Sequence, residues 1–143
     1  MINTLSDVHI VARTLYGEAR GEVDKVGLIA LEAVASVIWN RWSAHPSYFG
    51  PTPRDVCLKP YQFSCWNKND PNLKLLLSPL LSDHLYILYH DVAERFMGGR
   101  GEDVVHGSDH YHALWIDQPF WAYGKAPQID IGVHRFYKLM SKH

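Results

Sequence analysis

Residues 26–42 form a segment, VGLIALEAVASVIWNRW, that is apolar on nearly every side of a helix except at Glu32. A surface helix carries one apolar stripe, whereas a helix that is apolar all round must be enclosed by the rest of the fold. The alanines within the segment would let neighbouring elements approach it closely. The sequence therefore predicts a buried central helix from about Asp24, as its cap, to Trp42.

Further helices are expected from the spacing of apolar residues. Ser6 can cap the first, in which apolar positions recur every three or four residues as far as Leu15. Another spans about 82–97 and is stopped by the pair of glycines that follows it. Its predicted buried face consists of Leu85, Leu88, Val92 and Phe96. A shorter helix is expected over 73–77.

The sequence beyond Asp103 changes to a short alternation of polar and aromatic residues, which is typical of short strands and loops. Because the helices come first, the predicted fold class is α+β, with a helical lobe followed by a small irregular β region toward the C-terminus. The chain of 143 residues is long enough to build one core, and no repeat or linker divides it. We therefore expect a single domain over residues 1–143.

The composition argues against nucleic-acid-binding and membrane-spanning proteins. The formal net charge is −1 and the basic residues form no dense block, unlike in proteins that follow a phosphate backbone. No apolar run approaches the roughly 20 residues of a membrane span, so we expect no membrane insertion. The N-terminal residues lack the basic and apolar segments of a signal peptide, which predicts synthesis in the cytoplasm without a leader. We expect the chain to act as a monomer.

The segment YGEARGE places two carboxylates where the apolar stripe of the first helix continues. Extending the spacing past Leu15 leads to Glu18 and Glu22. A carboxyl group on a core-facing surface loses hydration, holds its proton more strongly and can act as a general acid. Alternatively, the helix ends at Gly17 or Gly21 and both glutamates lie in solvent or pair with arginine. Glycines on a catalytic turn would leave open space for a bulky substrate, because they carry no side chain.

Aromatic residues make up 13% of the chain, and many stand beside polar residues in loop-like stretches. Aromatic faces at a polar surface suit sugar rings, which stack on them much as bases do. In the loop segment QFSCW, Gln62, Phe63 and Trp66 could line a saccharide cleft, or the two rings could plug the loop onto the core. The same region holds Cys57 and Cys65, which form either a disulfide or two thiols.

Histidines near the C-terminus raise the question of a metal site. They are His106, His110, His112 and His134, and the segment HYH places two of them on one side of a predicted strand. Neutral imidazoles can bind zinc. No HExxH helix or cysteine ligand accompanies these residues, so we expect hydrogen-bonding histidines, no metal and no cofactor.

Five ordered segments together resemble the catalytic domain of the spore-cortex-lytic, SleB-like cell wall hydrolases. They are ARTLYGEARGE, AVASVIWNR, YQFSCWN, HYHALWIDQPFWA and IGVHRFY, and they extend over about residues 7–137. Several phage and prophage lysis proteins look similar. The resemblance implies a compact lysozyme-like domain that cleaves the glycan strand of peptidoglycan.

The resemblance also implies roles for individual residues. The glutamate of the YGE segment is taken as the catalytic acid of the family, and it corresponds to Glu18. Glu22 matches the second Gly-Glu pair, and we expect it to shape the substrate cleft or tune its neighbour. In a lysozyme-like arrangement, two segments should flank Glu18. One side is formed by Gln62, Phe63 and Trp66, and the other by the C-terminal β region. The substrate-binding residues expected from that region are Tyr111, His112 and Trp121.

The implied reaction is that of a lytic transglycosylase, which cuts between N-acetylmuramic acid and N-acetylglucosamine. It needs one carboxylate, because the sugar's own 6-hydroxyl attacks in place of a second catalytic group. One alternative is a muramidase that uses water with help from Glu22 or Asp70. Others are a zinc amidase or peptidase that acts on the stem peptides, and a noncatalytic glycan-binding or virion-assembly protein. We expect neither the family's usual N-terminal peptidoglycan-binding module nor a signal sequence in this protein, and this expectation favours a phage-type endolysin released through a holin.

Overall fold

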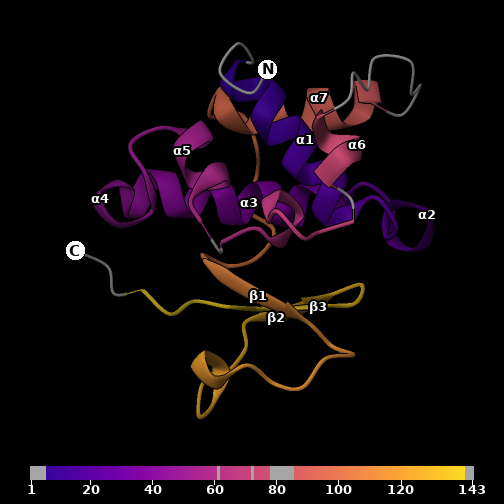
Figure 1. The fold of residues 1–143 in the computed structure, drawn as a ribbon. Coiled ribbons are helices and arrows are strands. Elements are labelled where there is room, and N and C mark those ends of the chain that lie inside the picture. Colours follow the sequence, from indigo (N-terminus) through magenta and orange to yellow (C-terminus); the bar gives the residue numbers. More distant parts are fainter. Residues whose placement is uncertain (1–5, 61, 72, 78–85, 141–143) are drawn as a thin grey trace.

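Helices form one lobe of the molecule and a small sheet forms the other (Figure 1). The computed structural model describes residues 6–60, 62–71, 73–77 and 86–140. The helices and 3₁₀ turns are α1 (Asp7–Ala19), α2 (Val23–Val26), α3 (Ile29–Ala44), α4 (Pro46–Phe49), α5 (Pro53–Leu58), η2 (Ser64–Trp66), α6 (Leu73–Leu77), α7 (Tyr86–Met97) and η3 (Phe120–Ala122). The strands are β1 (His110–Ala113), β2 (Ile129–Ile131) and β3 (His134–Tyr137). The predicted order, a helical lobe and then a small β region, is confirmed.

Helix α1 begins at the predicted cap, because the Ser6 side chain accepts a hydrogen bond of 3.3 Å from the His9 N–H. Its apolar stripe is buried, and Leu15 is fully enclosed. The helix does not stop at Gly17 but continues to Ala19. Glu18 therefore lies on the last turn of α1, where the stripe predicted it.

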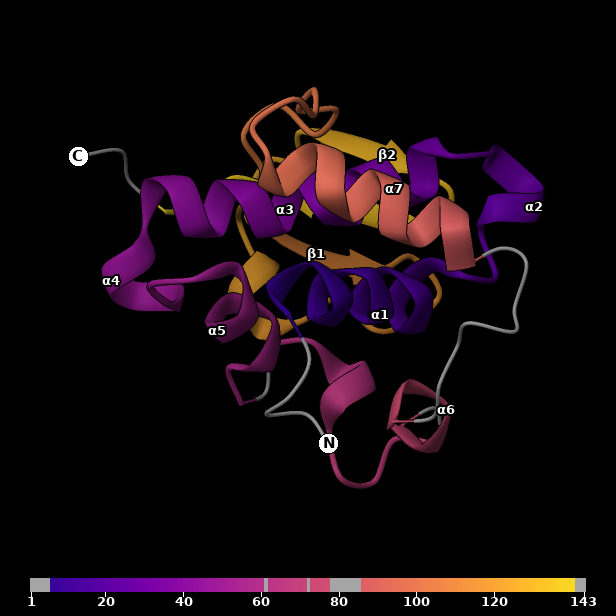
Figure 2. The same cartoon turned by 90° about the horizontal axis from the view of Figure 1, so that it is seen from above.

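Helix α3 is the central helix that its apolar sequence predicts. Its middle residues, such as Val37, are fully buried, and α3 packs against α1 and α7, which run alongside it in Figure 2. The expectation of one helix from Asp24 to Trp42 is wrong at its start, because the chain forms the short α2 and then breaks. Gly27 ends α2 with a φ of 83°, a left-handed conformation that favours glycine.

Helix α7 is described over Tyr86–Met97 and ends before two glycines, as predicted. The predicted start at 82–85, including Leu85, lies outside the described residues. Its buried residues are Tyr86, Tyr89, Val92, Ala93 and Phe96. Leu88 was expected on this face but is exposed. The helix instead turns its tyrosines inward, and the ring of Tyr89 packs edge-on against Tyr16 of α1 at 5.4 Å between centroids.

The sheet is antiparallel with the strand order β1-β3-β2. Tyr111 of β1 pairs with Phe136 of β3, and Phe136 pairs with Ile129 of β2. Phe136 is fully buried and belongs to the same hydrophobic core as the helices. The sheet is therefore anchored to the helical lobe, and this anchoring fixes the position of Tyr111.

The short helix expected over 73–77 is present as α6. It is held against α1 by a hydrogen bond of 2.6 Å from Arg13 Nη1 to the carbonyl oxygen of Leu76. In the part of the chain that the structure describes, no helix has both the length and the apolar character needed to cross a bilayer.

Candidate active site

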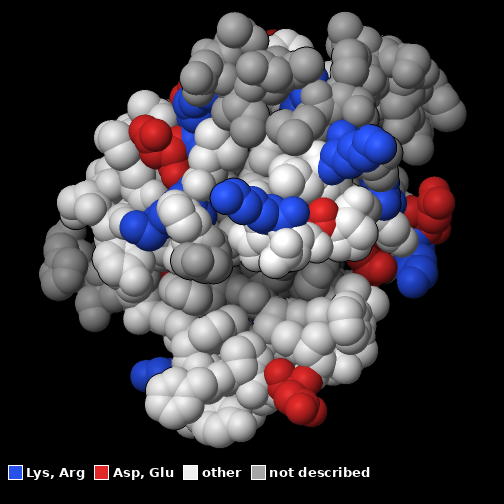
Figure 3. Space-filling view, viewed as in Figure 1, with Lys and Arg blue, Asp and Glu red and all other residues white. Residues whose placement is uncertain are grey.

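A cleft of about 610 Å³ is lined by residues from both lobes. Volumes of several hundred Å³ are typical of ligand sites. The helical lobe contributes polar groups that include Glu18, Arg41, Gln62 and Asp70. The β region contributes mainly aromatic and histidine side chains, which include Tyr111, His112, Trp115 and Trp121. On the face shown in Figure 3, charged residues gather on the helical lobe and are sparse on the β region.

Glu18 is held at this cleft by both of its carboxylate oxygens. Oε1 accepts a short hydrogen bond from the Tyr111 hydroxyl, and Oε2 accepts a hydrogen bond of 3.1 Å from the Cys65 N–H. These donors come from β1 and from the turn η2, so two segments that are distant in sequence from α1 fix its carboxyl group. A group held in this way is pre-organised for proton transfer.

Tyr111 is kept as a neutral hydroxyl by its surroundings. Burial, and next the neighbouring Glu18 carboxylate, raises the pKa of Tyr111 well above its ordinary value. The phenol therefore stays protonated at neutral pH and remains a hydrogen-bond partner for Glu18.

Gly17 gives close contact between α1 and the turn η2. A Cβ atom at this position would lie 2.6 Å from Cys65 Cβ and 2.8 Å from Cys65 Sγ. Gly17 is therefore needed because Cys65 fills the adjacent space, and the prediction that this glycine leaves room for substrate is wrong there. At Gly21, in contrast, an added Cβ would meet no atom within 4 Å.

We expect Gly17→Ala to destabilise the fold by about 1–3 kcal/mol, because the new methyl group overpacks the contact with Cys65. Gly21→Ala is the matched control and should be neutral or slightly stabilising, since its site is open. Chemical denaturation of both variants measures the free energies of unfolding. Equal effects of the two substitutions would contradict this explanation of Gly17.

Glu22 lies outside the cleft lining and binds the turn between β2 and β3. Its Oε1 accepts a hydrogen bond of 2.9 Å from the Val133 N–H, and its Oε2 lies 3.7 Å from Lys25 Nζ. Gly132 leaves room for this carboxylate, because a Cβ there would overlap Glu22 Oε1. Glu22 is thus placed to hold the turn between β2 and β3 against the helical lobe. Its effect on the cleft stays a prediction.

The three side chains predicted from the QFSCW loop have different surroundings. Gln62 lines the cleft with Glu18. Phe63 is 1% exposed and belongs to the core, so no surface of it is free for a sugar. Trp66 packs against the core, and its Nε1 donates a hydrogen bond of 2.8 Å to Thr14 Oγ1. Of the two roles that the sequence left open, Phe63 therefore has that of fixing the loop onto the core. Trp66 is partly buried and also fixes the loop, and its contact with sugar stays a prediction.

His112 and Trp121 both line the cleft, as does Tyr111. Both ring nitrogens of His112 lie 2.9 Å from a protein oxygen, one from the Ala113 carbonyl and the other from the Tyr137 hydroxyl. Its ring centroid lies 5.8 Å from that of Trp121. Among the described residues, no group of three or more histidine, cysteine, aspartate or glutamate side chains is arranged to hold a metal ion.

Cys57 and Cys65 are free, buried thiols. Burial raises the pKa of Cys57 to about 12. Burial, and next the Glu18 carboxylate, also raises the pKa of Cys65. Both thiols therefore remain protonated at neutral pH, which does not suit a cysteine nucleophile.

A sequence model of the cell wall hydrolase family matches residues 28–137. The chain belongs to this family. Its fold is similar to the catalytic domain of the Bacillus cereus SleB protein, with a TM-score of 0.69 and 23% identity over 92% of this chain and 89% of the other. It is also similar to the catalytic domain of the germination-specific lytic transglycosylase SleB from Bacillus anthracis, with a TM-score of 0.68 and 23% identity over 95% and 98%. No curated protein matches the chain.

Other residues line the cleft of this cell wall hydrolase although the sequence did not single them out, among them Trp115, Ile116 and Arg41. Trp115 and Ile116 follow β1, and Trp115 is 77% exposed. They lie within the segment HYHALWIDQPFWA, whose many aromatic residues could have indicated that it lines the cleft. Arg41 lies on the buried helix α3. Its position next to a helix end gave no sign that it would reach the cleft.

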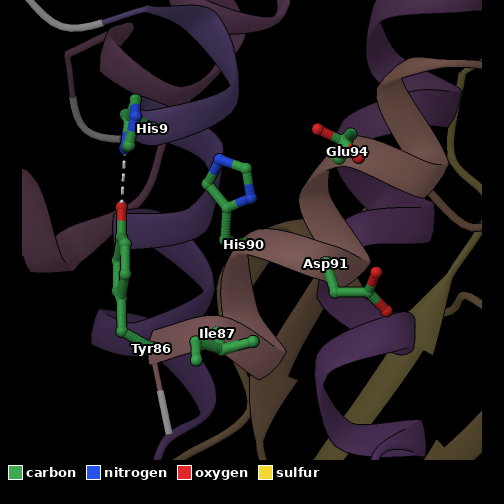
Figure 4. Close-up of a pocket in the computed structure, with 6 residues that line it drawn as sticks. All are labelled: His9, Tyr86, Ile87, His90, Asp91 and Glu94. Atoms are coloured by element: carbon green, nitrogen blue, oxygen red, sulfur yellow. Dashed lines mark hydrogen bonds between the residues drawn. The ribbon is translucent and has the colours of Figure 1, made fainter. Parts of the chain in front are cut away.

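The cell wall hydrolase has a second hollow, of about 320 Å³, between α1 and α7 (Figure 4). Here His9 Nδ1 lies 3.0 Å from the Tyr86 hydroxyl, and the rings of His9 and His90 are 5.1 Å apart. Burial, and next the charge of His90, lowers the pKa of His9. Glu18 follows His9 by about two and a half helical turns, or about 13.5 Å along the axis. The hollow shares no lining residue with the cleft and is therefore separate from it.

Proposed function

We propose that this cell wall hydrolase cleaves the glycan strand of peptidoglycan between N-acetylmuramic acid and N-acetylglucosamine, as a lytic transglycosylase. The observation that carries the proposal is Glu18, which lines an aromatic cleft and is fixed through both carboxylate oxygens. Glu18 precedes the segment matched by the family model, so its role rests on this geometry. The activity named for the Bacillus anthracis structure agrees with the proposal.

In this mechanism the protonated Glu18 donates its proton to the oxygen between the two sugars. The bond from this oxygen to C1 of muramic acid breaks, and positive charge develops at C1. The 6-hydroxyl of the same sugar attacks C1 and returns its proton to Glu18. The product is a 1,6-anhydro ring, no water is consumed, and one carboxyl group acts first as acid and then as base.

The Tyr111 hydroxyl is suited to both protonation states of Glu18. A hydroxyl group is a donor and also an acceptor, so it can donate to the ionised carboxylate and accept from the protonated acid. Because the pKa of Tyr111 is raised by burial and by Glu18, the hydroxyl keeps its own proton throughout. The hydrogen bond can therefore hold Glu18 in place during both steps.

We expect Tyr111→Phe to lower kcat on glycan strands by about ten- to hundredfold, because Glu18 Oε1 loses the donor that positions it. Tyr123→Phe is the matched control, since Tyr123 is 61% exposed and does not line the cleft. Steady-state kinetics on soluble glycan strands compare the two variants. Full activity of Tyr111→Phe would contradict the positioning role.

A water-dependent muramidase is the second candidate, because Asp70 places another carboxylate on the same cleft. Such an enzyme would use Asp70 to assist a water molecule and leave a reducing muramic acid end. An amidase has less support from this site, since both ring nitrogens of His112 have protein partners. Mass spectrometry of fragments released from purified sacculi separates these reactions. We expect anhydromuramic ends, whereas reducing ends support the muramidase and free stem peptides support the amidase.

A further inference from the structure

Arg41 is a buried cation at the proposed catalytic cleft. It lies near the C-terminal end of α3, is only 4% exposed and lines the cleft with Glu18 and Tyr111. Of the described residues that line this cleft, it is the only lysine or arginine. Burial lowers the pKa of His134, another lining residue, so that imidazole is not a competing cation at neutral pH.

The contacts of Arg41 fix its guanidinium but leave part of it without a partner. Its Nε donates a hydrogen bond of 2.7 Å to the carbonyl oxygen of Asp109. Its central carbon lies 4.9 Å from the ring centroids of both Phe49 and Phe63. Its Nη1 is buried and has no hydrogen-bond partner in the described part of the protein.

This arrangement is costly for the fold. A buried charge loses its hydration, and a buried donor without an acceptor costs free energy as well. Within the described ranges no carboxylate forms an ion pair with Arg41. Locally unfavourable groups of this kind are found at functional sites, where the rest of the structure compensates for them.

We propose that Arg41 is a positioning residue whose buried charge stabilises the Glu18 carboxylate formed when the proton leaves for the substrate. The inference rests on the proposed function of Glu18. Opposite charges attract more strongly in a cleft that excludes water than they do in bulk solvent. Arg41 therefore lowers the energy of the state in which Glu18 is ionised.

The Asp109 contact gives Arg41 a geometric part in the same arrangement. Asp109 directly precedes β1, and Tyr111 is the second residue of that strand. The bond from α3 to the Asp109 carbonyl thus holds the start of the strand that carries the hydroxyl bound to Glu18. Charge and position are separable, because a lysine keeps the first and loses the planar group that provides the second.

The test compares Arg41→Lys with Arg41→Met. Both side chains are unbranched, and both lose the guanidinium, but only lysine is charged. We expect kcat on soluble glycan strands to fall at least about tenfold in Arg41→Met, with KM within about twofold of the parent. Arg41→Lys should recover a large part of this loss. Arg95→Met is the control, because Arg95 also stacks on a phenylalanine but does not line the cleft.

Equal losses of kcat in the lysine and methionine variants would overturn the role of the charge. Thermal unfolding establishes that the variants are folded. If the methionine variant does not fold, Arg41→Gln replaces it, because glutamine is neutral and keeps a donor for the Asp109 carbonyl. If the parent enzyme releases no glycan fragments, the proposed function fails and the inference falls with it. If the parent cleaves strands and needs Glu18, equal losses in the Arg41 variants refute only the inference.

Discussion

Glu18→Gln is expected to lower glycan cleavage by about 10²–10⁴-fold while the protein stays folded. Glutamine keeps the size and shape of the side chain but cannot transfer a proton. Its amide oxygen can still accept one of the two hydrogen bonds that hold Glu18, from Tyr111 or from Cys65. Release of soluble fragments from purified sacculi measures the activity, and thermal unfolding shows whether the fold is retained.

Asp70→Asn is the control for this prediction, because Asp70 is the other described carboxylate on the cleft. A lytic transglycosylase needs a single carboxyl group, so this variant should keep activity within about threefold of the parent. Activity of Glu18→Gln near the parental level would refute the assignment of Glu18. Similar large losses in both variants would instead indicate a pair of carboxylates and favour the muramidase.

Phe63→Ala is expected to destabilise the protein by about 3–5 kcal/mol, the usual result of truncating a buried aromatic residue. Phe63 is 1% exposed, and its ring also packs against the Arg41 guanidinium. The loss is large for a domain whose total stability is about 5–15 kcal/mol. Denaturant unfolding measures it directly.

Trp115→Ala is the matched substitution of an aromatic residue that lines the cleft and is 77% exposed. It should leave stability nearly unchanged and weaken glycan binding by about 1–3 kcal/mol, on the scale of stacked bases. Binding of chitooligosaccharides is measured on both variants and normalised to the folded fraction. If Phe63→Ala loses affinity without losing stability while Trp115→Ala keeps its affinity, Phe63 and not Trp115 contacts the sugar.

The parts of the fold that follow from local periodicity could be predicted from the sequence. The apolar stripe of α1 placed Glu18 on a helical turn, and the structure continues the helix to Ala19. The apolar run over 26–42 predicted the buried α3, although the predicted start near Asp24 was too early. These features depend on residues three or four positions apart, which any sequence displays directly.

Contacts between distant segments could not be predicted in the same way. Phe63 and Trp66 are aromatic, like many sugar-binding residues, but Phe63 is buried and Trp66 is partly buried because η2 packs against α1. The sequence suggests that Gly17 leaves open space on the helix, but in the fold Cys65 occupies that space. Arg41 belongs to the cleft only because β1 returns to the end of α3, 68 residues later at Asp109.

Digestion of purified sacculi in water enriched with oxygen-18 tests the central claim most directly. A lytic transglycosylase uses the sugar's own 6-hydroxyl, so the anhydromuramic ends should carry no label and Glu18→Gln should release almost no fragments. New reducing muramic acid ends, labelled at C1 and formed in place of anhydromuramic ends, would contradict the account, because they would show that water and not the 6-hydroxyl attacks the glycosidic carbon.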